Sequence, residues 1–223
     1  MSRLEGIFCC HLDNVKFVVH NLLMSVKKQA RQHYHHGDLA ASLVAAAVVL
    51  LEQQGPASLS LRAVARAAGV CHGAPAHHFG DKTGLLTAVA IQGHALLAVA
   101  LADQQRDQQT ASKRLIAAGE AYIRFAVANP AHFAIMFQSD LIDCHNVDYL
   151  AAGAITWQVL EDSVRALGAD SERAIAATVV SLWSKVHGFS TLWLAGNFGD
   201  PGDEQLLQSL ITEMLTSFDT KPS

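Results

Sequence analysis

From residue 38 onward, the sequence is dominated by Ala and Leu and contains no run of alternating β-branched and polar residues. Ala and Leu are among the strongest helix formers, whereas a half-buried strand needs an alternating, β-branched pattern. Apolar residues make up 51% of the 223 residues and charged residues only 16%, which is enough to build a packed core without disulfides or metals. We therefore predict an all-α protein.

Capping residues and glycines predict where the helices begin and end. Asp38, Ser60 and Asp81 are residue types that cap helix N-termini, and Gly-Pro at 55–56 and Gly69 are typical helix stops. Pro130, Ser171 and Asp203 begin later helices, and Gly168 and Gly196 end them, by the same reasoning. The expected helices cover residues 38–54, 61–68, 72–78, 81–106, 112–128, 130–138, 147–167, 171–195 and 203–218.

Residues 58–79 have the spacing of a helix-turn-helix. Ala65 and Ala68 are small where two helices must approach, Val70 can enter the core, and Gly69 stands where the turn needs a positive φ. The helix after this turn would then enter a DNA major groove. Helix-glycine-helix arrangements also occur in ordinary helical bundles. This segment alone therefore leaves two interpretations, a DNA-binding motif and a part of an ordinary bundle.

The charge of the chain is unevenly distributed along the sequence. Residues 1–90 hold eight Lys/Arg and five Asp/Glu, a net +3, while residues 91–223 hold eight and fifteen, a net −7. A basic N-terminal part on an acidic body fits a module that meets a polyanion, although an asymmetry of this size can also arise by chance.

Several classes of protein are disfavoured. The apolar stretch at 39–51 is too short for a membrane span, and Glu5, Asp13 and Lys16 interrupt any secretory signal. The four cysteines form no Cys-x-x-Cys pair, so we expect a reduced protein in the cytoplasm. Residues 1–23 differ in composition from the rest of the chain. One hypothesis is that translation begins at Met24.

Neither catalysis nor a metal site is predicted. The sequence lacks a Gly-x-Ser-x-Gly elbow, a His-Glu-x-x-His motif and a phosphate-binding glycine loop, so we expect no enzyme and no cofactor. Twelve histidines are many, and His33, His35 and His36 lie close together, as do Cys71 and His72. Adjacent residues on one helix rarely converge on one ion, so metal binding is only the weaker alternative.

Two sets of motifs resemble one known family. Tyr-His-His-Gly-Asp-Leu at 34–39, Ala-x-x-Ala-Gly-Val at 65–70 and Asp-Lys-x-x-Leu-Leu at 81–86 closely resemble the N-terminal domain of TetR-family transcriptional regulators. Ala-Tyr-x-Arg-Phe-Ala at 121–126 and Trp-x-x-x-His-Gly at 183–188 look like the TetR subgroup whose ligand domain is named for a Trp-His-Gly signature. The resemblance implies a homodimeric repressor that binds double-stranded DNA and is released from it by a small-molecule effector.

The resemblance also implies domains and DNA contacts. Residues 1–33 would be an extension with a basic arm, 34–81 a three-helix helix-turn-helix head, and 82–219 a helical effector-binding and dimerisation domain. The implied DNA-binding residues are Lys27, Lys28, Arg31, Ser60, Arg62, Cys71, His72, Gly73, Ala74, His77, His78 and Lys82.

The recognition helix departs from the family pattern. Cys71 stands where Ser or Thr usually caps, and Ala76 replaces the usual Tyr that presses on a phosphate. Residues 72–78 contain no Arg or Lys, so histidines must make the contacts, and DNA affinity is expected to rise as the pH falls toward 6. The alternative function is a helical ligand-binding or metal-binding protein with weak or lost DNA binding.

Candidate effector contacts are apolar and aromatic residues beyond residue 91, which can equally be ordinary core. They are Phe133, Met136, Phe137, Trp157, Trp183 and His187. Trp183 and His187 lie four residues apart, so they can also form an internal hydrogen bond. An anionic effector is disfavoured by the acidic body, unless Arg124 or Lys185 faces inward.

We expect a dimer, because the last two helices carry more apolar surface than one small domain needs. Two copies would bury this surface in a four-helix interface. The alternative is that the same leucines close the core of the monomer. The leucines concerned are Leu182, Leu192, Leu206, Leu210 and Leu215.

Overall fold

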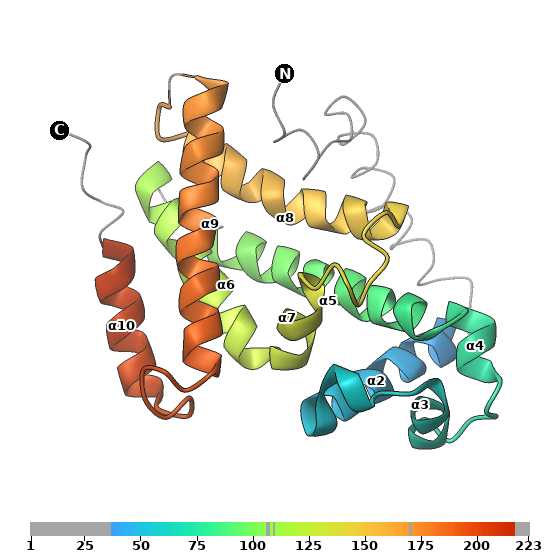
Figure 1. Cartoon of the computed structure of the whole chain (residues 1–223). Coiled ribbons are helices and arrows are strands. Elements are labelled where there is room, and N and C mark those ends of the chain that lie inside the picture. The colour runs from blue at the N-terminus through green and yellow to red at the C-terminus, as the bar shows by residue number, and fades with distance from the viewer. Residues whose placement is uncertain (1–36, 106–107, 109, 170, 217–223) are drawn as a thin grey trace.

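The computed structural model describes residues 37–105, 108, 110–169 and 171–216, and its regular elements over these residues are all helices (Figure 1). The all-α prediction is confirmed. Three helices form a small N-terminal unit, the head: α2 (Gly37–Ser58), α3 (Leu61–Ala67) and α4 (Ala74–Phe79). The others form the body: α5 (Lys82–Gln105), α6 (Ala111–Ala128), α7 (Pro130–Met136), α8 (Val147–Arg165), α9 (Glu172–Leu194) and α10 (Glu204–Thr216).

Most of the predicted caps form. The Ser60 hydroxyl accepts the Ala63 N–H at 3.3 Å, and the Asp81 carboxylate accepts the Gly84 N–H at 2.8 Å. Ser171 caps α9 in the same way. These side chains satisfy N–H groups that the first helical turn leaves without a partner, so the sequence places these helix starts correctly.

Three helix starts differ from the predictions. The first helix begins at Gly37, so Asp38 lies inside it. Helix α4 begins at Ala74 rather than at residue 72, because Pro75 fits the first helical turn and the preceding residues form a turn. Thr110, and not a residue further on, caps α6 by accepting the Lys113 N–H at 3.2 Å.

Helix α5 is the central element of the molecule. It packs against α2 and α4 of the head and against α6, α7 and α8 of the body. Two segments, Leu39–Ser58 and Lys82–Gln105, are long and apolar enough to cross a membrane by length and composition alone. In α5, half of the apolar window is buried by other helices, so its hydropathy reflects a place in the protein core.

One contiguous apolar core runs from the head into the body. It includes Leu43 and Val64 in the head and Ile123 and Ile211 in the body, with α5 contributing to both parts. The leucines expected at a dimer interface divide between two environments. Leu215 is 1% exposed and belongs to this core, which is a correction, whereas Leu192 is 45% exposed on α9.

Candidate functional site

The turn between α3 and α4 has the geometry that its sequence predicts. Gly69 has a φ of 69°, a left-handed conformation that glycine tolerates best. The Val70 N–H donates to the carbonyl of Ala65 at 3.0 Å, and Val64 and Ala65 are buried beneath the turn. The two short helices are thereby held at a fixed angle at the outer end of the head (Figure 1).

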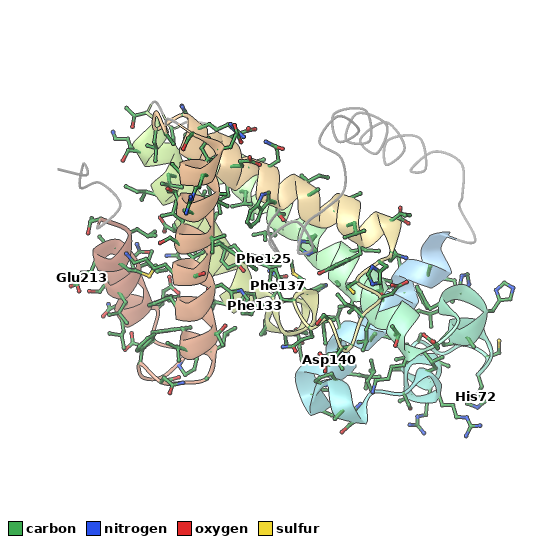
Figure 2. All side chains as sticks on the ribbon, turned by 45° about the horizontal axis from the view of Figure 1, so that its top comes forward. His72, Phe125, Phe133, Phe137, Asp140 and Glu213 are labelled. Atoms are coloured by element: carbon green, nitrogen blue, oxygen red, sulfur yellow. The ribbon has the colours of Figure 1, made fainter. Side chains whose placement is uncertain are left out.

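Most of the residues predicted to touch DNA in this region are exposed. Arg62 lies on α3, and Cys71 and His72 lie in the turn that follows. Figure 2 shows His72 at the outer edge of the head, directed away from the body. Gly73, His77 and Ser60 are exposed as well, although Ser60 also caps α3.

Three predicted contacts have a different environment. Ala74 is only 9% exposed and packs into the core, so its side chain is not available for a base, which corrects the prediction. His78 is half-buried, with its ring 6.1 Å from that of Phe79. The Lys82 ammonium donates to the carbonyl of Ala57 at 3.4 Å, which ties the start of α5 to the end of α2. Lys27, Lys28 and Arg31 lie outside the described residues.

The body contains a cavity of about 110 Å³ between α5, α6, α8 and α9. Its walls are mainly apolar and aromatic, and none of the residues that line it is Lys, Arg, Asp or Glu. Three of the six residues predicted to contact an effector line it, namely Phe137, Trp157 and Trp183. The cavity also has a lining that sequence reasoning missed: His94, Tyr122, Tyr149, Gly153 and Thr156, with aliphatic side chains between them.

The other three predicted effector residues do not line the cavity. Phe133 and Met136 are 7% and 0% exposed and belong to the apolar core, as the apolar spacing alone also allowed. Phe133 and Phe137 lie together inside the body (Figure 2), with ring centroids 6.0 Å apart. The His187 ring lies 5.0 Å from that of Phe133 in a tilted arrangement and 4.9 Å from that of Phe137, edge to face.

Trp183 and His187 do not bond to one another, and both contact the hydroxyl of Tyr122. The indole N–H of Trp183 donates to the Tyr122 oxygen at 3.3 Å, and that oxygen lies 2.8 Å from Nδ1 of His187. Burial raises the pKa of Tyr122 and lowers the pKa of His187, so both are neutral at physiological pH. This arrangement fixes the Trp183 ring in the cavity wall.

His94 is the most unusual polar residue of the cavity. It is 4% exposed, and burial lowers its pKa to about 4, so the ring is neutral at physiological pH. Its Nδ1 lies 3.4 Å from the Thr156 hydroxyl, and its Nε2 has no hydrogen-bond partner among the described residues. The sequence signal for this position was the one histidine of a mainly apolar helix.

The basic residues considered for an anionic effector do not line the cavity. Arg124 instead pairs with Glu120 at 3.0 Å and with Glu204 at 2.8 Å, and it also contacts Gln208. These contacts raise the pKa of Arg124 and join α6 to α10. Its guanidinium therefore has a structural role in docking the last helix.

Within the described part of the chain, no three His, Cys, Asp or Glu side chains converge to hold a metal ion. Cys71 and Cys144 are free thiols. The cluster of His33, His35 and His36 lies outside the described residues.

Two family models match this chain. Residues 43–89 match the model described as bacterial regulatory proteins of the tetR family, and residues 115–215 match the tetracyclin repressor-like C-terminal domain. An HTH-type transcriptional regulator of Mycobacterium tuberculosis is 28% identical over 190 residues, which cover 68% of this chain and 81% of that protein.

Solved structures agree with these matches. A protein of unknown function from Rhodococcus sp. RHA1 is 29% identical, with a TM-score of 0.66 over 84% of this chain and 98% of the other. AibR, solved with isovaleryl coenzyme A and operator DNA, shares the fold at 16% identity and a TM-score of 0.59, over 78% and 97% of the two chains.

Proposed function

Because the chain belongs to the TetR family of DNA-binding transcriptional regulators, we propose that it is a repressor released from its operator by a small molecule in the α5–α9 cavity. Members of this family are not enzymes, and they bind operator DNA and effector ligands. The cavity is the observation that carries the proposal, because four helices line it and one of them is the central helix α5.

We propose that residues 34–81 are the DNA-binding head, and that residues 1–33 are an extension with a basic arm. Arg62, Cys71, His72 and His77 are exposed near the turn and would meet phosphates or base edges. Ser60 and Lys82 would bring the N-termini of their helices toward the phosphate backbone.

Helix α5 supports the proposed coupling between effector and DNA. Its first turn is tied to the head by the Lys82 contact with Ala57, and Leu86 is buried in the core that the head shares with the body. His94 lines the cavity twelve residues after Lys82, about 18 Å along the helix. A ligand that favours one position of α5 would shift the spacing of two heads away from the roughly 34–36 Å of a half-site repeat.

The proposed dimer would use α9 and α10 of residues 82–219. Val180, Leu192 and Phe198 are 49%, 45% and 41% exposed in a single chain, and Leu206 and Leu210 are half-buried. Two copies would bury this apolar surface in one interface. A sedimentation mass equal to a single chain would exclude the dimer.

We further propose that the chain belongs to the Trp-His-Gly subgroup. The presence of Trp183, His187 and Gly188 on α9 supports this proposal. A DNA-binding regulator acts where the chromosome is, so the proposed location is the bacterial cytoplasm.

The test is fluorescence anisotropy of the purified protein on the DNA upstream of its own gene, with scrambled DNA as the control. We expect binding tighter by about a thousandfold on the native fragment, with an affinity that falls steeply with added salt. Weak and equal binding to both fragments would favour the alternative, a helical ligand-binding or metal-binding protein whose DNA binding is weak or lost.

A further inference from the structure

The polar groups that line the cavity are nearly all committed to protein partners. Tyr149 donates its hydroxyl hydrogen to the carbonyl of Met136 at 2.9 Å, and Tyr122 bonds with Trp183 and His187. Among the described residues, the buried side-chain polar atoms that lack a partner are Nε2 of His94 and Nε1 of Trp193. Of these two, His94 lines the cavity.

The hydrogen bonds of Thr156 determine which form of the neutral His94 ring is present. A threonine hydroxyl has one hydrogen, and Thr156 donates it to the carbonyl of Gly153 at 2.9 Å. This is the shorter of its two contacts, so we assign the hydrogen to the carbonyl, and the hydroxyl oxygen then accepts from Nδ1 of His94 at 3.4 Å. With the ring proton on Nδ1, Nε2 carries a lone pair and can only accept a hydrogen bond.

From this geometry we infer that the effector is a compact, uncharged, mainly apolar molecule with one hydrogen-bond donor, such as a phenol or an alcohol, which donates to Nε2 of His94. This inference rests on the proposed function of the cavity and adds the chemical class of its ligand. A buried acceptor without a partner is costly, and a donor on the ligand removes that cost.

The other properties of the cavity agree with this class. No cationic side chain lines it, so a carboxylate or phosphate group would lose its hydration without an ion pair. Its volume of about 110 Å³ is of the same order as an engineered protein cavity of roughly 150 Å³ that takes up benzene. A single aromatic ring with at most a small substituent is a ligand of suitable size.

Gly153 lies beside the Nε2 edge of the His94 ring. A Cβ atom placed on Gly153 would lie 3.8 Å from Nε2 and 3.7 Å from Cε1 of His94, an ordinary contact distance. The change Gly153→Ala is therefore sterically tolerated by the fold, and alanine also favours a helix. Its methyl group would lie against Nε2 and would crowd a ligand donor there.

Three probes of similar size separate the ligand classes by isothermal titration calorimetry on the full chain. 4-Methylphenol and anisole are isomers, and only the phenol has a donor, while benzoate has a negative charge. We expect the phenol to bind about tenfold more tightly than either of the others.

Two variants test the role of the acceptor. In His94→Leu the preference for the phenol over the anisole should disappear, because the acceptor is gone. In Gly153→Ala the phenol should bind at least about threefold more weakly, although His94 is intact. Thermal melting of both variants verifies that they are folded.

Several results would overturn the inference: equal binding of phenol and anisole to the unaltered chain, tighter binding of the benzoate, no binding of any probe, or a preference that survives His94→Leu. The proposed function is tested separately by DNA binding. If the phenol preference depends on His94 but saturating phenol leaves operator affinity unchanged, the ligand class stands and the effector-released repressor fails. If operator binding is specific and no phenol preference exists, only the ligand class fails.

Discussion

The hydroxyl oxygen of Tyr122 on α6 lies 2.8 Å from Nδ1 of His187 on α9, and it also accepts the indole N–H of Trp183. Trp183 can only donate, so the hydroxyl hydrogen of Tyr122 points to His187. One hydroxyl group thus joins α6 and α9, two neighbouring helices that both line the cavity.

Removing this hydroxyl with Tyr122→Phe should lower the free energy of unfolding by about 1–3 kcal/mol, because two half-buried nitrogen atoms lose their partner. Tyr149→Phe is the matched control, since its hydroxyl has one partner, the Met136 carbonyl. We expect it to cost about 1 kcal/mol. Urea denaturation of both variants measures the difference, and a smaller loss for Tyr122→Phe than for Tyr149→Phe would contradict the bridging role.

Gly93→Ala should destabilise the fold although alanine is the better helix former. The new Cβ would lie 2.5 Å from Sδ of Met136 and 3.1 Å from Cβ of His132, both buried. Overpacking of this kind costs about 1–3 kcal/mol. Gly188→Ala is the control, because nothing lies within 4 Å of its added Cβ, and it should be neutral or stabilising by up to about 1 kcal/mol. A melting temperature for Gly93→Ala at or above that of the unaltered chain would show that α5 and α7 can separate freely.

Stability should fall as the pH is lowered from 6.5 toward 4. Burial lowers the pKa of His94 to about 4, so below its ordinary value of 6.5 the unfolded chain binds a proton that the folded chain does not. The unfolded state is then favoured by about 1.4 kcal/mol per pH unit, or about 2 kcal/mol at pH 5. His132 and His187, whose pKa values burial also lowers, act in the same direction.

The variant His94→Leu isolates the contribution of one histidine to this pH dependence. Chemical denaturation at pH 7 and pH 5 should give a smaller loss of stability for this variant than for the unaltered chain. Identical losses would mean that His94 is not kept neutral by the fold.

Arg62→Ala should weaken DNA binding uniformly across sequences and reduce the slope of log affinity against log salt by about 1, if this exposed side chain contacts a phosphate. Lys113→Ala is the control, because Lys113 is an exposed cation at the start of α6 in the body. Anisotropy titrations over a salt series compare the two. Equal slopes for the two variants would remove Arg62 from the interface.

DNA affinity should rise by roughly tenfold between pH 8 and pH 6 at fixed salt, because histidine side chains gain charge in this range in general and a charged imidazole neutralises phosphate. His94 does not interfere in this range, since its pKa is near 4. The double change His72→Gln and His77→Gln should reduce this pH dependence, because these are the two exposed histidines next to the turn. Equal affinities of the unaltered chain at pH 6 and pH 8 would count against histidine contacts with DNA.

The sequence by itself determined the helical class, most helix boundaries and the turn of the head. These features depend on local chemistry: Ser60 and Asp81 accept N–H groups three residues away, and Gly69 adopts a φ that other residues rarely adopt. Family motifs in the same segment then indicated DNA binding. Such signals lie within a few residues of one another, so they can be read along the chain.

Only the tertiary structure decided which apolar residues surround a cavity and which fill the core. Phe133 and Phe137 share an apolar pattern at helical spacing, yet the first is core and the second lines the cavity. His94 and Thr156 are 62 residues apart in the chain and meet only because α5 packs against α8. Side-chain periodicity reports which face of a helix is buried, but it does not report what packs against that face, because that depends on contacts between distant segments.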